Sequence, residues 1–240
     1  MSLRYWFVII TFVVVAQLFS AVLAIPLYAL ELDFGDVITI STISSFALGL
    51  LIIWLLIRKE SDPVRGNEPP MHIGWSLLLG FGGLFAAIFA QNIAFQLQQL
   101  LYDAPVESEN TQMLLDIMTE NVWLLIAVVI LGPILEELVF RQAIFGHLYK
   151  KMNFFWAALI SSVVFSAIHF DFTHILVYTA VGFVFAGLYV WSKRIIVPII
   201  AHVLMNAFAS LPILLDIDIE DLEEMEENLQ FIFGILGAWM

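Results

Sequence analysis

The sequence contains no cysteine and unusually little charge. Of its 240 residues, 13% are charged and 62% are hydrophobic, whereas a soluble globular domain has about a quarter charged and about half apolar residues. The absence of cysteine excludes a disulfide, a thiolate nucleophile and a cysteine-ligated metal. The scarcity of charge, with a mean hydropathy of +0.97, excludes an ordinary soluble domain and predicts an integral membrane protein.

Basic residues are also scarce, with 9 Lys and Arg against 22 Asp and Glu. The acids gather between the apolar runs, at 31–36, 103–110 and 216–228, so the net charge of −13 does not indicate a soluble acidic surface. No small-residue cleavage site of a signal peptide is present, and the first apolar run is too long for a signal sequence. We therefore expect this run to be a retained helix.

Apolar runs near the length of about 20 residues that crosses a bilayer recur along the chain. They predict an all-α polytopic transmembrane bundle, a single membrane domain over 1–240. About seven spanning helices are expected, at 5–30, 37–57, 73–101, 121–148, 154–170, 173–192 and 195–214. The apolar segment 229–240 is too short to span comfortably and is predicted to be interfacial or re-entrant. Small residues at Gly80, Gly83, Gly182 and Ala186 predict closely packed helices.

The basic residues indicate the orientation of the bundle. Arg4 precedes the first helix, and the other basic clusters lie in the connections 58–65, 150–151 and 193–194. If all seven segments span, these positions share one side and the acidic segments share the other. Because basic loops are retained in the cytoplasm, we predict a cytoplasmic N-terminus.

One apolar run contains three ionisable residues, in the stretch "ILEELVFRQ" at 134–142. Glu137 and Arg141 are four residues apart on one helix face and are predicted to form a bidentate ion pair. Glu136 points about 100° away and lacks that partner, so it is expected to be protonated or to meet water or a metal. Pro133 removes a backbone hydrogen bond and is predicted to kink the helix and admit water. Ionisable residues inside a membrane indicate a functional site.

Two later helices carry matching polar residues. Phe165 and His169 are four apart in "FSAIHF", and His202 and Asn206 are four apart in "HVLMN". Counting the rise per residue places both histidines at depths compatible with Glu136. We therefore expect one shared cavity near the middle of the membrane.

Each of these features also has a simpler interpretation. A single membrane histidine is often an interhelical hydrogen bond, and the Glu137–Arg141 pair alone would serve as a helix lock. Asp171 and Thr173 stand where a helix begins and are expected to be caps. His174 is close enough in sequence to His169 to reach the cavity.

Three motifs stand in order: E-E-x-x-x-R at 136–141, F-x-x-x-H at 165–169 and H-x-x-x-N at 202–206. This set resembles the CPBP family of intramembrane proteases, also called the CAAX protease and bacteriocin-processing or Abi family, which includes the type II CAAX prenyl endopeptidases. The resemblance covers roughly 120–210, which it implies to be the catalytic core, with accessory helices in 1–101.

The resemblance also implies a role for each motif residue. Glu136 would activate water with His169 beside it, and His202 and Asn206 would stabilise the oxyanion. The supporting pair would be Glu137 and Arg141. All of these residues match the motifs.

The metal requirement is left open by the residues. Glu136, His169 and His202 form a two-histidine, one-carboxylate set of the kind that holds catalytic zinc, although no HExxH motif is present. Asn206 is a poor zinc ligand, whereas its amide N–H suits an oxyanion. We favour a site without a cofactor, with zinc as the alternative, so the enzyme would be a glutamate-type protease or a metalloendopeptidase.

Three functions are compatible with these residues. The first is an intramembrane endopeptidase that acts on a membrane-embedded, prenylated or leader-bearing protein or peptide, in a bacterial plasma membrane. The second is a non-catalytic bacteriocin-immunity or interaction protein that retains the family core. The third is a proton or ion carrier, although no inverted repeat or paired broken helices are visible. The lipid bilayer is an expected partner, and nucleic acid is not.

Overall fold

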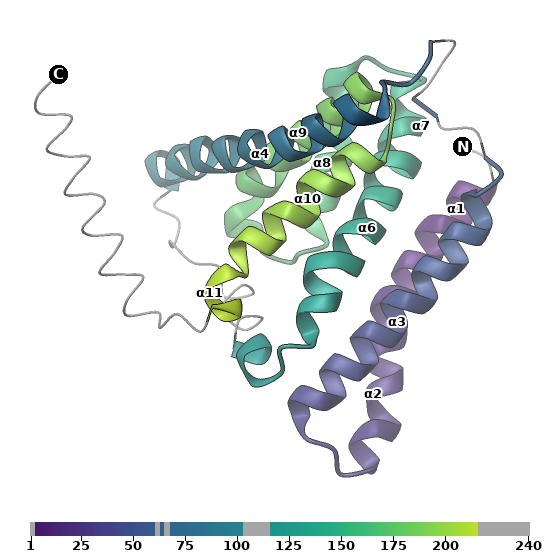
Figure 1. The fold of residues 1–240 in the computed structure, drawn as a ribbon, viewed down its shortest axis with the longest axis vertical. Helices are drawn as coiled ribbons and strands as arrows, with labels where there is room; N and C mark the ends of the chain where they lie inside the picture. The colour runs from purple at the N-terminus through teal and green to yellow at the C-terminus, as the bar shows by residue number, and fades with distance from the viewer. Residues whose placement is uncertain (1–2, 61–62, 65–67, 103–115, 216–240) are drawn as a thin grey trace, which may run out of the picture.

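The computed structural model describes residues 3–60, 63–64, 68–102 and 116–215, apart from the side chains of Pro212 and Leu214. Throughout these ranges the secondary structure is helical, without a strand, which confirms the predicted all-α class (Figure 1). Helices satisfy every internal backbone hydrogen bond, as lipid requires. The apolar segment 229–240 and the acidic segments 103–110 and 216–228 lie outside the described residues.

Four helical stretches in the described part are long and apolar enough to cross a membrane. They match four of the predicted segments closely. The first combines α1 (Leu3–Thr11), η1 (Phe12–Leu18) and α2 (Phe19–Ala29); the others are α3 (Phe34–Ile57), α4 (Ile73–Tyr102), and η4 (Phe172–His174) followed by α9 (Ile175–Ser192).

The other three predicted segments are helical but differ from simple spans, and they carry the three sequence motifs. The helices α8 (Phe154–Ala167) and α10 (Ile196–Ala209) have 14 residues each, about 21 Å at the usual rise, against about 30 Å of hydrocarbon. A short helix, α11 (Leu211–Leu214), follows α10. The remaining segment is a continuous run of η2 (Ile126–Leu131), α6 (Gly132–Glu136), η3 (Glu137–Phe145) and α7 (Gly146–Tyr149), hereafter the motif helix.

The motif helix lies between two groups of helices (Figure 1). On one side, α1, α2 and α3 form a hairpin whose α1 contacts η3 and whose α3 contacts η2 and α6. The apolar core between the hairpin and the motif helix includes Val8, Ile53 and Leu135, all fully buried. Phe12 also packs edge-to-face on Phe140, with ring centroids 5.7 Å apart. The hairpin thus supports the motif helix from the side opposite α10.

On the other side, α4, α8, α9 and α10 pack closely through small residues. A Cβ on Gly83 of α4 would lie 2.9 Å from the Cβ of Ala201 on α10, and a Cβ on Gly182 of α9 would lie 2.6 Å from the Cβ of Ser162 on α8. These distances confirm the predicted close packing at both glycines.

The basic connections gather at one end of the molecule. Arg4 donates to Glu60 at 2.6 Å, and Arg194 donates through Nε to the Met71 carbonyl at 2.6 Å. Lys193, whose left-handed backbone ends α9, pairs with Glu68. The lysine lowers the pKa of the exposed Glu68 carboxyl through this hydrogen bond. These contacts place Arg4, Lys193 and Arg194 beside the connection between α3 and α4, which agrees with the common side predicted for them. The assignment of that side to the cytoplasm stays a prediction.

Candidate active site

The first motif begins where the motif helix changes its hydrogen-bonding pattern. Residues Glu137–Phe145 form a π-helical segment, and a second such segment, η2, precedes Pro133. Such widened turns are frequent at functional sites. The helix continues through Pro133, and the kink and water path expected there stay predictions.

Glu137 and Arg141 are paired in the interior, as their spacing predicts. Both side chains are almost fully buried, and Arg141 Nε lies 3.3 Å from Glu137 Oε2. The contact is not the bidentate pair that was expected, because neither Nη atom of Arg141 has a hydrogen-bond partner among the described residues. The guanidinium instead lies over the rings of Phe165 and Phe185, with Cζ 4.4 and 5.3 Å from their centroids. These π faces partly compensate a desolvated cation.

The second oxygen of Glu137 reaches a different helix. Glu137 Oε1 lies 2.9 Å from Nδ1 of His202 on α10, and both groups are buried. A carboxylate accepts, so Nδ1 carries the proton and donates it to Glu137. This contact fixes the tautomer of His202 and directs its Nε2 away from Glu137.

Nε2 of His202 faces Glu136, whose Oε2 is 3.6 Å away. That distance is too long for a direct hydrogen bond and leaves the two groups in ion-pair contact. The Glu136 side chain is 18% exposed, against 0% for Glu137, so of the two carboxylates it is the more accessible. Glu136 forms no ion pair with Arg141, as the sequence predicts. The sequence did not predict that Glu136 and Glu137 would both lie against the imidazole of His202.

Asn206 lies one turn beyond His202 and contacts the motif helix. Its Nδ2 donates to the carbonyl of Val128 at 2.9 Å. An amide nitrogen carries two N–H donors, and this bond uses one of them. The bond thus fixes the carboxamide against η2, about two turns before Glu136.

His169 lies in the turn after α8 rather than within a helix. Its Nδ1 is 2.9 Å from the carbonyl of Phe165, so Nδ1 is the protonated nitrogen and Nε2 is the free base. Phe165 connects the two histidines, since its ring centroid is 4.8 Å from that of His169 and 6.0 Å from that of His202. His169 thus reaches the site through this aromatic contact.

The residues after His169 form a separate hydrogen-bonded turn. Asp171 accepts from the backbone N–H of His174 at 3.3 Å and from the Thr173 hydroxyl at 2.6 Å, which confirms Asp171 as a cap. The ring of His174 also lies against Asp171, with Nδ1 2.9 Å from Oδ2. We therefore assign His174 to this turn rather than to the site around Glu136.

The donor chemistry is compatible with zinc. His202 Nδ1 is held by a carboxylate and His169 Nδ1 by a backbone carbonyl, which leaves both Nε2 atoms as bases, as is typical of metal-ligating histidines. In the described part of the chain, however, no three His, Asp or Glu side chains lie close enough together to hold an ion. The ligand set Glu136, His169 and His202 thus stays a prediction.

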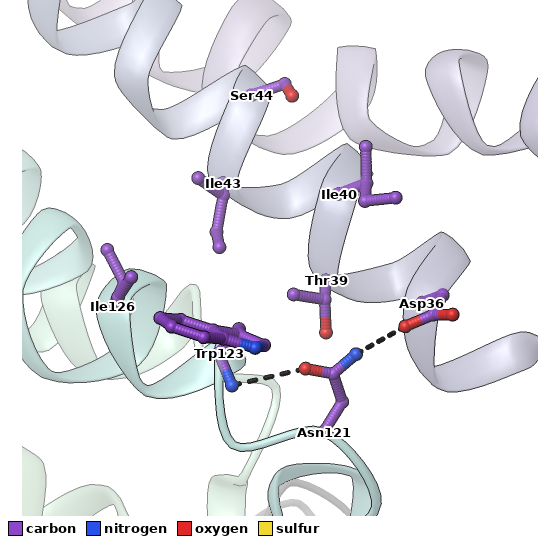
Figure 2. A pocket seen from close by; sticks show the side chains of 8 residues that line it. All are labelled: Asp36, Thr39, Ile40, Ile43, Ser44, Asn121, Trp123 and Ile126. Atoms are coloured by element: carbon purple, nitrogen blue, oxygen red, sulfur yellow. Dashed lines mark hydrogen bonds between the residues drawn. The ribbon is translucent and has the colours of Figure 1, made fainter.

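A pocket of about 340 Å³ lies elsewhere, between α3 and the start of the motif helix. Figure 2 shows Asn121 bridging its two walls, since its amide donates to Asp36 at 2.6 Å and its carbonyl oxygen accepts from the Trp123 N–H at 3.2 Å. No motif residue lines this pocket. It marks the seam between the hairpin and the motif helix rather than the candidate active site.

Comparison with known proteins explains the arrangement. Residues 118–208 match the family model of type II CAAX prenyl endopeptidase Rce1-like proteins. The chain is also 40% identical over 243 residues to the "Putative membrane peptidase YdiL" of Bacillus subtilis (strain 168), covering 98% of each chain. The chain belongs to the Rce1-like CAAX protease family.

A second relative supports this assignment. The chain is 34% identical over 200 residues to the "Membrane-embedded CAAX protease MroQ" of Staphylococcus aureus (strain USA300), covering 79% of each chain. No solved structure gives a significant match. The protein is therefore a multi-pass membrane protease of the Rce1-like family, and all three motifs lie within the matched residues 118–208.

Proposed function

We propose that the chain is an intramembrane endopeptidase that hydrolyses a peptide bond through a water activated by Glu136. The observation that carries the proposal is the imidazole of His202, held at Nδ1 by Glu137 and facing Glu136 with Nε2. This arrangement presents a base and a potential donor to one small volume. Peptide hydrolysis needs both, a base for water and a donor for the developing oxyanion.

In the first step, a water beside Glu136 attacks the carbonyl carbon of the substrate. A new C–O bond forms, the carbonyl π electrons move to the oxygen, and the water proton passes to Glu136. His169, whose Nε2 is basic because Nδ1 donates to Phe165, assists in orienting this water. Base catalysis of this kind typically accelerates a reaction by about 10²–10⁴.

The tetrahedral oxyanion is then stabilised by His202 and Asn206. In this step His202 acts as an imidazolium, whose Nε2–H donates to the oxyanion while its Nδ1–H donates to Glu137. Asn206 donates the amide N–H that is not used by Val128. Glu136 returns its proton to the leaving nitrogen and the C–N bond breaks, which gives an amine and a carboxylic acid that then releases its proton to solvent.

Glu137 and Arg141 support this array without contacting the substrate. Arg141 lies 3.3 Å from one oxygen of Glu137 while His202 holds the other at 2.9 Å. The carboxylate is thereby fixed in orientation, and so is the imidazole. A zinc ion on Glu136, His169 and His202 would supply Lewis acidity to the same carbonyl.

For the substrate we propose a membrane-embedded peptide or a prenylated or leader-bearing protein, cleaved in a bacterial plasma membrane. The support is the apolar surroundings of the site and the names of its relatives, one of which is called a CAAX protease.

The test uses the purified full chain in lipid nanodiscs with three quenched fluorescent probes. One probe carries an S-farnesyl cysteine followed by three apolar residues, the second is its unprenylated twin, and the third is a single transmembrane peptide. We expect one new peptide terminus by mass spectrometry in at least one probe. Intact probes that remain bound to the protein would indicate the interaction function, and proton flux into liposomes without cleavage would indicate a carrier.

A further inference from the structure

The helix α9 carries none of the three motifs, yet it contacts both motif histidines. Tyr178 and Phe185 lie on it seven residues apart, which is two helical turns and therefore the same face, about 10 Å apart along the axis. Each ring lies against a different histidine.

The two contacts have the same geometry. The ring of Tyr178 stacks on His169 with centroids 4.4 Å apart and planes inclined by 26°. The ring of Phe185 stacks on His202 with centroids 4.8 Å apart and an inclination of 29°. Phe165, by contrast, meets both imidazoles nearly edge-on, at 68° and 80°.

We propose that Tyr178 and Phe185 are positioning residues that fix the planes of the two imidazoles, which rests on the proposed function of His169 and His202. The hydrogen bond at Nδ1 fixes one edge of each imidazole, but the plane of the ring can still tilt through the side-chain dihedral angles. A stacked ring removes this freedom, and offset stacking is a favoured arrangement of aromatic pairs. Together the bond and the ring direct each Nε2.

Both stacking contacts are made by the same helix, α9. Phe185 also lies under the Arg141 guanidinium, 5.3 Å from Cζ, so the ring that orients His202 belongs to the same cluster as the Glu137–Arg141 pair. α9 itself is held by α4 and α8 on either side. One well-packed helix therefore supplies the ring contacts that orient both histidines.

The test is a set of leucine variants of the full chain in nanodiscs. Tyr178→Leu and Phe185→Leu remove one ring each, and Tyr178→Phe keeps the ring. Phe183→Leu is the matched control, since Phe183 is on the same helix but packs on Phe154 and Phe155. Histidine ring resonances are recorded by NMR with labelled histidine and assigned by single histidine substitutions.

We expect selective effects. Protons over an aromatic face are shifted upfield, so Tyr178→Leu moves the His169 signals alone and Phe185→Leu moves the His202 signals alone. On whichever probe the wild type cleaves, each of these variants lowers kcat about three- to tenfold with KM unchanged, because the proposed rings act through the histidines. Tyr178→Phe and Phe183→Leu retain the wild-type kcat.

The proposal is overturned if Tyr178→Leu leaves the His169 signals in place, or if it and Phe183→Leu have equal kcat. If Phe185→Leu fails to fold, Tyr178→Leu tests the proposal by itself, because Tyr178 is only half-buried. The NMR arm needs no substrate. If the NMR shifts are selective but the wild type cleaves no probe, the proposed function is contradicted and the stacking of Tyr178 and Phe185 on the histidines still stands.

Discussion

Replacing Glu137 by alanine removes the carboxylate that joins two helices. In the native structure its two oxygens serve Arg141 on the same helix and His202 on α10. After the substitution, Arg141 stays buried at 1% exposure of its side chain without the carboxylate that contacts it. His202 also loses the acceptor of its Nδ1 proton.

The decrease in the free energy of unfolding follows from the loss of these two contacts. Removing one member of a buried ion pair typically destabilises a protein by about 3–5 kcal/mol, because the remaining charge is uncompensated. The faces of Phe165 and Phe185 under the guanidinium keep the value within this range rather than above it. For a chain of this length, such a loss corresponds to a decrease of roughly 6–20 °C in Tm.

The assay is thermal unfolding of the full chain in one detergent, followed by tryptophan fluorescence. Glu120→Ala is the matched control, since Glu120 is an exposed carboxylate just before the motif helix, and it should leave Tm unchanged. The double variant Glu137→Leu/Arg141→Met removes both charges and should unfold at a higher temperature than Glu137→Ala. If Glu137→Ala unfolds with the wild-type Tm, the buried-pair reasoning is wrong.

Three further predictions concern other parts of the molecule. Asn206→Ala removes a proposed oxyanion donor and should lower kcat about 10²–10³-fold with little change in KM; a wild-type kcat would remove Asn206 from the mechanism. Exhaustive chelation should leave cleavage intact, because the amide of Asn206 suits an oxyanion better than it suits zinc. The prediction is wrong if the active protein contains stoichiometric zinc, if chelation stops cleavage and if added zinc restores it. Gly83→Ala should lower the free energy of unfolding by about 1–3 kcal/mol, since its Cβ would meet Ala201 at 2.9 Å, whereas Gly82→Ala, with open space around it, should not. Equal melting temperatures would contradict the close packing of α4.

Local sequence patterns predicted most of the helices and one of the polar contacts. Apolar run length gave four spans to within a few residues, and the i,i+4 spacing gave the Glu137–Arg141 pair. The basic residues were predicted to share one side because their positions depend only on the number of crossings. Each of these inferences uses neighbours in sequence or a simple count.

The rest depends on contacts between distant residues. Glu137 and His202 are 65 positions apart, and no single sequence shows that a carboxylate already paired with arginine also holds a histidine. Tyr178 and Phe185 belong to an apolar helix in a chain with 21 phenylalanines, so their spacing carries no distinguishing signal. The ends of α8 and α10 were missed because apolar residues continue past Ala167 and Ala209, and hydropathy cannot locate a turn inside an apolar run.

The most direct test of the account is the rate at which Glu136→Gln cleaves the probe that the wild type cleaves. Glu136 makes no direct hydrogen bond with His202 across 3.6 Å, so the variant should fold with the wild-type Tm. Its kcat should fall at least about a hundredfold, because the amide cannot accept the water proton. Cleavage by folded Glu136→Gln at the wild-type rate would contradict the role of Glu136 as the base, and with it the proposed mechanism.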